Sequence, residues 1–239
     1  MGGALAFLTP FGRATEPTPG AMTWFPLVGS VIGLAVGGSW WLAGRAFPVP
    51  LAAAVALAVD AAVTGCLHLD GLADSGDGLL PPMERARRLE VMRDPAVGAF
   101  GAITLGVFLL LRFGALTSAR PAVLVVAALW AASRTAMVLT AWTLRYARHE
   151  GIATPFIQND PERWRLVLSG GGGLVLSVVL AVIGRGWRGL AAVGVGILGF
   201  GAVIALARAR IGGYTGDVLG AAGVVGETLG LMALATTWT

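Results

Sequence analysis

The densest group of potentially reactive side chains is a run of three aspartates. They are Asp70, Asp74 and Asp77, separated by four and three residues, in a stretch that begins at His68. On an α-helix with 3.6 residues per turn, this spacing places the three carboxylates within an arc of about 60°. Carboxylates that close repel one another, most strongly where the dielectric is low, and a divalent cation removes the repulsion. Because oxygen-only ligands favour Mg²⁺ or Mn²⁺, the run predicts a metal site.

An EF-hand loop, a solvated acidic face and a helix N-terminus each fit this run less well. An EF-hand loop needs carboxylates at alternate positions and a glutamate at its twelfth. A solvated acidic face rarely carries Leu72, Leu79 and Leu80 among so many glycines. A helix N-terminus favours one acidic residue rather than three. His68 could act as an acid or base or contact phosphate, with a hydrogen-bonded turn histidine as the alternative.

A glycine-rich turn precedes the last apolar segment. Two arginines come before it, and its residues of interest are Gly213, Thr215, Gly216 and Asp217. Glycine-rich turns that open a helix expose backbone N–H groups and bind phosphate. We therefore expect the turn to contact substrate phosphate and Asp217 to add a metal ligand. A tight turn between two helices explains the pattern equally well.

Arg93 and Asp94 end a long polar stretch just before Pro95. An Asp-Pro pair favours a turn or a helix start, so capping is the alternative to a place in the site. If they belong to the site, Arg93 binds substrate and Asp94 takes part in catalysis.

Arg134 lies inside an apolar segment, between Ser133 and Thr135. A charge at membrane depth is costly and usually faces the interior of the bundle. Its guanidinium fork suits a phosphate, so we interpret it as substrate-binding. The alternative is a structural ion pair with Glu227 or Asp60.

Transmembrane helices are the elements expected to hold these residues in place. The chain has 239 residues, of which 56% are hydrophobic and only 13% charged, against about a quarter in a soluble domain. A span needs about 20 mostly apolar residues. Seven segments qualify, at 24–44, 49–67, 97–116, 121–141, 166–184, 189–207 and 217–237.

These segments predict an all-α, polytopic helix bundle that forms one domain over residues 1–239. Polar loops are expected at 68–96 and 142–165. The last segment is the weakest, because Asp217 and Glu227 interrupt it. Six spans plus a partial seventh is therefore the alternative. Gly216, Gly220, Gly223, Glu227 and Gly230 share one helix face, which predicts close helix packing there.

Arginine supplies all 17 basic residues, and their distribution predicts the orientation in the membrane. With a cytoplasmic N-terminus, four fall on the outside, at Arg45, Arg120, Arg185 and Arg188. Eleven fall on the inside, at Arg13, Arg85, Arg87, Arg88, Arg93, Arg145, Arg148, Arg163, Arg165, Arg208 and Arg210. This bias follows the positive-inside rule and puts the aspartate run and the glycine turn on the cytoplasmic face of the cell membrane. Arginines between apolar runs also argue against a nucleic-acid-binding domain.

Four stretches together resemble the cobalamin synthase family, the adenosylcobinamide-GDP ribazoletransferases. They are Phe25–Gly29, Thr64–Gly78, Met92–Gly101 and Gly213–Ala221. They occur in the right order, and the resemblance covers nearly the whole chain. Two positions depart from the family pattern. Arg13 follows Thr9-Pro10-Phe11-Gly12 instead of the usual Thr-Arg-apolar-Pro, and Cys66 replaces a small residue.

The resemblance implies a Mg²⁺-dependent phosphoryl transfer at the membrane. A ribose hydroxyl of α-ribazole, or of its 5′-phosphate, attacks adenosylcobinamide-GDP, and GMP leaves. Metal would lie at Asp70, Asp74 and Asp77, and Arg134 with the glycine turn would hold further negative charge. Asp77 or Asp94 would take the proton.

Two rival functions and two structural questions stay open from the sequence. A CDP-alcohol phosphotransferase would show Ala-Arg after Asp-Gly, whereas Ala73 is followed by Asp74. A solute transporter would use the intramembrane charges Asp60, Arg134 and Glu227. The oligomeric state, homo-oligomer or monomer, and the number of metal ions also stay open.

Overall fold

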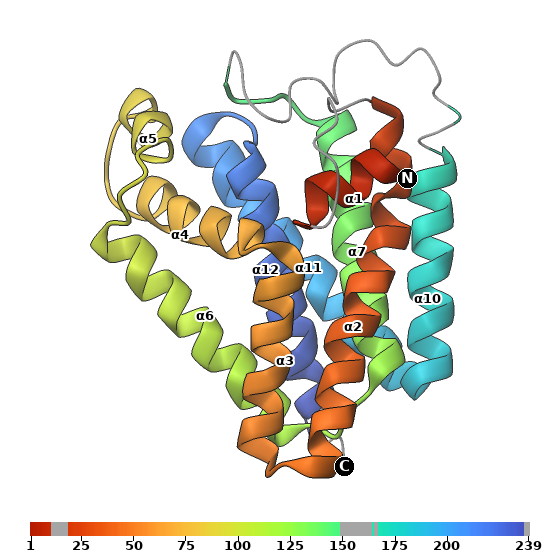
Figure 1. The fold of residues 1–239 in the computed structure, drawn as a ribbon. Helices are drawn as coiled ribbons and strands as arrows, with labels where there is room; N and C mark the ends of the chain where they lie inside the picture. The colour runs from red at the N-terminus through yellow and green to blue at the C-terminus, as the bar shows by residue number, and fades with distance from the viewer. Residues whose placement is uncertain (11–18, 149–163, 165–166, 237–239) are drawn as a thin grey trace.

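The structure is a computed structural model that describes residues 1–10, 19–148, 164 and 167–236. This part of the chain is a bundle of α-helices without a named strand, and Figure 1 shows most of them running between the two ends of the molecule. Its helices are α1 (Gly2–Leu8), α2 (Phe25–Ala46), α3 (Val49–Thr64), α4 (Leu67–Leu79), α5 (Arg85–Val91), α6 (Ala99–Ser118), α7 (Val123–Thr143), α10 (Gly172–Arg185), α11 (Trp187–Ile211) and α12 (Gly216–Ala235), with a 3₁₀ turn at Pro19–Trp24 and a π turn at Val167–Gly171. The predicted all-α membrane bundle is confirmed.

Six helical segments of the described chain are long and apolar enough to cross a membrane, and a bent pair can count as a seventh. The six are Gly20–Ala46, Ala99–Ser118, Val123–Thr143, Leu168–Arg185, Trp187–Ile211 and Gly216–Ala235. The broken segment is the second one, α3 with α4, and not the last one as the sequence suggested. α12 continues through both of its acidic residues because Glu227 has ion-pair partners inside the bundle.

Small residues bring the central helices close together. A Cβ on Gly33 of α2 would lie 2.6 Å from the Ala127 backbone of α7, and one on Gly226 of α12 would lie 2.6 Å from the Gly196 carbonyl of α11. Such close approach is how helices gain dispersion contacts in lipid. The predicted packing face of α12 is confirmed at Gly220, Gly223 and Gly230, whereas Gly216 has open space around it.

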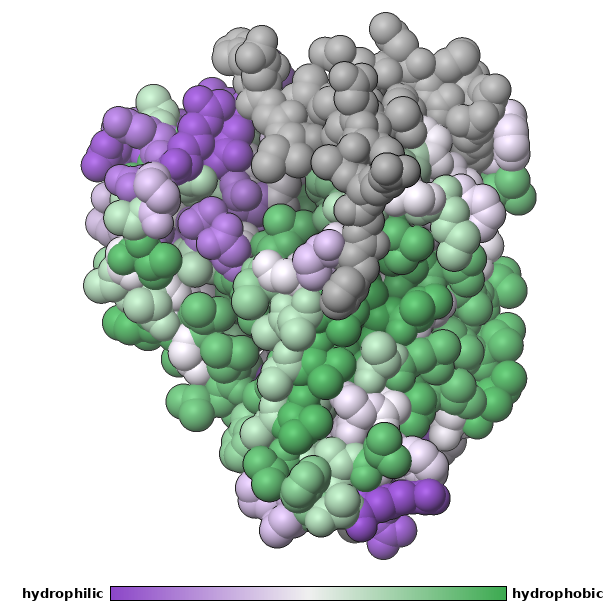
Figure 2. Space-filling view, in the orientation of Figure 1, coloured by the Kyte–Doolittle hydropathy of each residue, from purple (hydrophilic) through white to green (hydrophobic). Residues whose placement is uncertain are grey.

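α7 and α12 are the most buried spans, and α6 and α10 are the most exposed. Exposed leucine and isoleucine side chains cover the outer faces of these two helices, among them Ile103, Leu110, Leu174 and Ile183. In Figure 2 hydrophobic surface forms a broad band between hydrophilic caps at the α5 corner and at the opposite end. The band has the pattern expected of a surface that faces lipid.

The two ends of the bundle carry unequal charge. The α2–α3, α6–α7 and α10–α11 connections meet at one end, where Arg120, Arg185 and Arg188 line a shared groove. α1, α4, α5 and the turn before α12 gather at the other end, together with most of the described arginines (Figure 1). Arg13, Arg163 and Arg165, which the sequence predicts at this end, lie outside the described residues, as do His149 and most of the expected loop at 142–165.

Candidate active site

The aspartate run lies on a short helix that turns across the end of the bundle. α3 ends at Gly65, and both Gly65 and Cys66 have left-handed backbone conformations, with φ of 57° and 59°. The following helix, α4, leaves at 91° to α3 (Figure 1). The expected polar loop at 68–96 therefore contains two helices, α4 and α5, and Asp70, Asp74 and Asp77 lie on a helix as predicted.

α4 packs tightly against the beginning of α12. A Cβ on Gly71 would lie 2.7 Å from the carbonyl oxygen of Asp217, and one on Gly220 would lie 3.2 Å from the Cα of His68. Glycine at these positions lets the two backbones touch. The crossing brings Asp217 next to Asp70 and Asp74, although 143 residues separate Asp74 from Asp217 in the sequence.

Asp70, Asp74 and Asp217, called the end carboxylates below, share a region of unbalanced negative charge. The carboxylates of Asp70 and Asp74 have no hydrogen-bond or ion-pair partner among the described residues. Burial, together with the charges of Asp217 and Asp70, raises the pKa of Asp74 to about 7. A carboxyl group in this state gains most from a nearby cation, which would restore its ionised form.

Asp77 points the other way, into the junction of α4 with α6. Its two carboxylate oxygens accept hydrogen bonds from the backbone N–H groups of Gly98, at 2.7 Å, and Gly101, at 2.8 Å. A Cβ on Gly101 would collide with this carboxylate. Asp77 thus binds the first N–H groups of α6, which have no partner within the helix. A metal or catalytic role for Asp77 stays a prediction, but its observed contacts are those of a helix cap.

Asp94 and Arg93 lie on the surface beyond α5. Asp94 is exposed, and its carboxylate accepts the backbone N–H of Ala96 at 2.9 Å, which is the turn-capping alternative named from the sequence. Arg93 is exposed too and borders an open groove of about 520 Å³ beside α5. Neither side chain lines the cavity that the end carboxylates face.

The glycine-rich turn has the tight interhelical form. Gly212 ends α11 with φ of 74°, and a Cβ on Gly213 would collide with the carbonyl oxygen of Arg145. Tyr214 then pairs with the chain after α7, donating to Arg145 at 3.2 Å and accepting from Ala147 at 2.8 Å.

Thr215 is fully buried and caps α12, where its hydroxyl accepts the N–H of Val218 at 3.2 Å. Only Gly216 of the three predicted phosphate-binding residues lines the cavity. The turn therefore holds the start of α12 in place.

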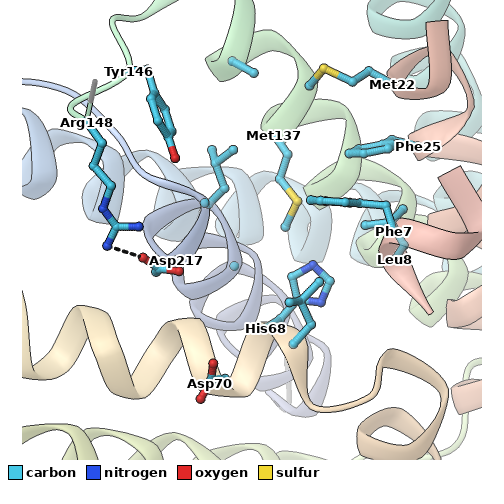
Figure 3. A pocket seen from close by; sticks show the side chains of 15 residues that line it. Phe7, Leu8, Met22, Phe25, His68, Asp70, Met137, Tyr146, Arg148 and Asp217 are labelled. Atoms are coloured by element: carbon cyan, nitrogen blue, oxygen red, sulfur yellow. Dashed lines mark ion pairs between the residues drawn. The ribbon is translucent and has the colours of Figure 1, made fainter. Parts of the chain in front are cut away.

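A cavity of about 160 Å³ lies between α1, α2, α4, α7 and α12. Figure 3 shows its two contrasting sides. Phe7, Met22, Phe25 and Met137 make one side apolar, and His68, Asp70, Arg148 and Asp217 make the other polar. This combination suits a small molecule with an apolar ring and a polar or anionic part.

His68 lines this cavity as a buried, neutral imidazole. Burial lowers its pKa well below the usual range, and the positive charges of Arg134 and Arg112 lower it further. Its Nδ1 atom is buried and has no hydrogen-bond partner. The turn-histidine alternative required a satisfied hydrogen bond, and the described contacts give none at Nδ1.

Sequence reasoning missed Arg148 and Tyr146 as site residues. Arg148 forms an ion pair with Asp217 at 2.9 Å and donates to the Met92 carbonyl at 3.1 Å. Tyr146 lies beside it in the cavity wall (Figure 3). From the sequence we interpreted Arg148 only as a marker of membrane orientation. A weak signal existed, since Tyr146 and Tyr214 are the only tyrosines in the chain and Tyr214 lies within the predicted glycine-rich turn.

Arg134 belongs to a separate group in the middle of the bundle, called the buried ion network below. It consists of Asp60, Arg112, Arg134 and Glu227, all at least nine-tenths buried. Arg134 and Arg112 both bind Glu227, and Arg112 also binds Asp60. The structure thus forms the ion pair that was the alternative to substrate binding by Arg134. The same ion pairs neutralise Asp60, Arg134 and Glu227, the charged residues that a transporter would use.

The end carboxylates fit a Mg²⁺ ion that also binds substrate. In the described part of the chain no three His, Cys, Asp or Glu side chains already converge on one metal position. Mg²⁺ is usually held by one or two carboxylates plus the phosphates of a substrate, rather than by a complete protein cage. Asp70 at the cavity wall and Asp74 close to it meet that requirement.

Comparisons with known proteins show the family of this chain. The family model described as cobalamin-5-phosphate synthase matches residues 1–235. An adenosylcobinamide-GDP ribazoletransferase of an Escherichia coli strain is 37% identical over 215 residues, which cover 88% of this chain and 85% of the relative. Proteins of the same name from Citrobacter koseri and Shigella boydii are 35% and 36% identical over the same shares. No solved structure matches the chain.

The comparisons test the resemblance drawn from four separate stretches of sequence. The matched region includes the bend, α4, the buried ion network and the turn before α12, so the site described above lies wholly within it. The resemblance is confirmed: this chain is an enzyme that belongs to the cobalamin-5-phosphate synthase family.

Proposed function

We propose that the protein transfers the cobinamide phosphoryl group of adenosylcobinamide-GDP to α-ribazole or its 5′-phosphate. A ribose hydroxyl oxygen forms the new P–O bond, the bond from that phosphorus to the oxygen of GMP breaks, and GMP leaves with the electron pair. The hydroxyl proton passes to a base. The products are adenosylcobalamin, or its 5′-phosphate, and GMP.

One observation carries the proposal: Asp70 lines a cavity with an apolar and a polar side, and the carboxylate of Asp74 lies close to it, both without a partner among the described residues. Phosphoryl transfer needs positioning and charge neutralisation more than covalent help from the protein. Asp70 and Asp74 supply uncompensated negative charge, and Asp217 lies beside them. These three carboxylates would hold Mg²⁺, which supplies neutralisation of the diphosphate oxygens when bound.

The remaining predicted residues take distinct parts in this proposal. His68 is the candidate base that lines the cavity, where its buried Nδ1 has no hydrogen-bond partner, but its lowered pKa makes it a weak proton acceptor. Asp77 positions α4 through the N–H groups of α6. Asp94 is less well placed for catalysis, since it is exposed and bound to its own turn.

We further propose that this end of the bundle faces the cytoplasm of the cell. Basic residues near span ends accumulate on the cytoplasmic side. The site end has eleven arginines by sequence and the opposite end has four. A cysteine-accessibility experiment tests this, because the single exposed cysteine, Cys66, lies beside the site. An impermeant thiol reagent should label it in inverted membrane vesicles and leave it unlabelled in intact cells.

The decisive experiment is a product assay on the purified protein in detergent or nanodiscs. Adenosylcobinamide-GDP is mixed with α-ribazole, or with its 5′-phosphate, at fixed Mg²⁺ and after chelation. We expect stoichiometric GMP and cobalamin product only when both substrates and Mg²⁺ are present. Absence of GMP with either acceptor would refute the proposed reaction, and full activity after chelation would refute the metal assignment.

A further inference from the structure

The structure contains a second depression that the predicted site did not include. It is the open groove of about 520 Å³ beside α5, lined by Arg85, Arg93, Arg148 and Ala147 with Leu89 and Glu90. Its three arginines outnumber its one acidic residue, and Glu90 is already paired with Arg87 at 2.8 Å. The groove therefore presents net positive charge to a ligand.

Arg148 lines both this groove and the 160 Å³ cavity. Its side chain is 10% exposed and pairs with Asp217 at 2.9 Å. Its Nε atom is buried and has no hydrogen-bond partner. Arg148 therefore has an N–H donor without a partner at the place where the two depressions meet. It can bind an anion there, since a guanidinium group can bind two oxygens at once.

The two depressions differ in the ligand that they suit. The cavity is small and half apolar, and the corrin ring of a cobinamide is far larger than its volume. The groove is open and basic, which suits a diphosphate whose remaining parts extend into solvent or along the protein. A transferase with two substrates needs two binding sites that adjoin each other at the group being transferred.

We propose that the groove binds the nucleoside diphosphate of the donor, that the cavity binds the acceptor, and that Arg148 binds the transferred phosphoryl between them. Asp217 is ion-paired with Arg148 at 2.9 Å. A cation held by Asp217 would neutralise its charge and would free Arg148 for the diphosphate. The proposal rests on the proposed function for the identity of the donor, whereas the location of the diphosphate site rests on the geometry.

Binding of GDP to the full-length protein tests the location without turnover. Calorimetric titrations with GDP, with and without Mg²⁺, compare the wild type with Arg148→Ala and Arg93→Ala. Arg145→Ala is the matched control, because Arg145 is exposed on the same loop and lines neither depression. We expect Mg²⁺-dependent binding that weakens at least about tenfold in Arg148→Ala and Arg93→Ala. Equal GDP affinity in all four proteins would overturn the groove assignment.

Kinetics of GMP release test the catalytic part. We expect Arg148→Lys to lower kcat by about 10²-fold, because a lysine keeps the charge and loses the fork. Free guanidinium should restore part of the activity of Arg148→Ala. Arg93→Ala should raise KM for the donor alone, and Met137→Ala, in the cavity wall, should raise KM for the acceptor alone.

The two sets of results separate the proposals. If the wild type releases GMP while Arg148→Lys keeps the wild-type kcat, the role of Arg148 is wrong and the reaction stands. If the wild type releases no GMP, the reaction is wrong, and the GDP titrations still decide where a nucleoside diphosphate binds.

Discussion

The buried ion network and the end carboxylates are built from the same kinds of charged residue and have opposite surroundings. In the network, Asp60 and Glu227 face Arg112 and Arg134, so two negative and two positive charges balance. Hydrogen bonds add to these ion pairs: Glu227 accepts one from Ser133, and Asp60 accepts one from Trp130. Arg112 donates one to Thr228. Lipid-facing helices surround it.

The end carboxylates have three negative charges and one bound arginine, Arg148. Asp70 and Asp217 line a cavity, and the pKa of Asp74 is raised to about 7 by burial and by its acidic neighbours. A charged residue in this chain is therefore best judged by whether its neighbours balance its charge. The balanced group links α3, α6, α7 and α12, and the unbalanced group is left for a ligand.

The largest expected effect is that of Asp74→Asn, and the contrast between the two groups is wrong if this variant keeps its activity. Removing this carboxylate should lower GMP release by about 10⁴-fold, because metal stabilisation of a phosphoryl-transfer transition state is worth several kcal/mol. The thermal unfolding midpoint should stay within about 1 °C or rise, since an unbalanced charge is removed from the protein. A protein that loses activity and stability together would instead assign Asp74 to the fold.

In the buried ion network, the change that corresponds to Asp74→Asn is Glu227→Gln. It leaves Arg112 and Arg134 with one carboxylate between them, and breaking a buried pair costs about 3–5 kcal/mol of unfolding free energy. Thermal unfolding in detergent measures this loss. The fraction that remains folded should still release GMP at a rate near the wild-type rate. A stable but inactive Glu227→Gln protein would place the network in the chemistry.

Gly71→Ala tests the contact that joins α4 to α12. A methyl group there would lie 2.7 Å from the Asp217 carbonyl and push α4 away from α12. We expect a loss of about 1–3 kcal/mol in unfolding free energy, as for other overpacked contacts, and a clear fall in kcat. Gly114→Ala is the matched control, because a methyl group on this helical glycine meets nothing within 4 Å. Equal effects in the two variants would contradict the close crossing.

Asp77→Asn gives the smallest and most discriminating change. The asparagine side chain accepts a hydrogen bond through one oxygen only, and its N–H group faces a backbone N–H of α6. The free energy of unfolding should therefore fall by about 1–2 kcal/mol. The Mg²⁺ concentration that gives half-maximal GMP release should stay unchanged, whereas Asp70→Asn should raise it. A raised Mg²⁺ requirement in Asp77→Asn would support the prediction that Asp77 binds metal.

The sequence was informative wherever a feature repeats within one helix. The seven apolar segments, the helical aspartate run and the small-residue face of α12 were all visible from local spacing. The resemblance to the family was visible too, because its motifs are contiguous stretches.

Sequence spacing failed where the deciding contact joins distant segments. The three aspartates look equivalent in sequence, yet Asp77 faces Gly98 and Gly101 while its neighbours face α12. Arg148 resembles any other loop arginine until α12 brings Asp217 beside it. Arg134 had two interpretations that only the position of Glu227 could separate.

The sharp turn at Gly65 and Cys66 decides where the end carboxylates lie relative to the apolar spans. If α3 continued straight, its rise of about 1.5 Å per residue would carry Asp77 about 20 Å above Thr64, out into water. The 91° turn lays the carboxylates flat on the bundle instead, level with the ends of the spans. If the proposed reaction takes place at these carboxylates, a substrate held in the headgroup layer and one arriving from solution would reach the same height.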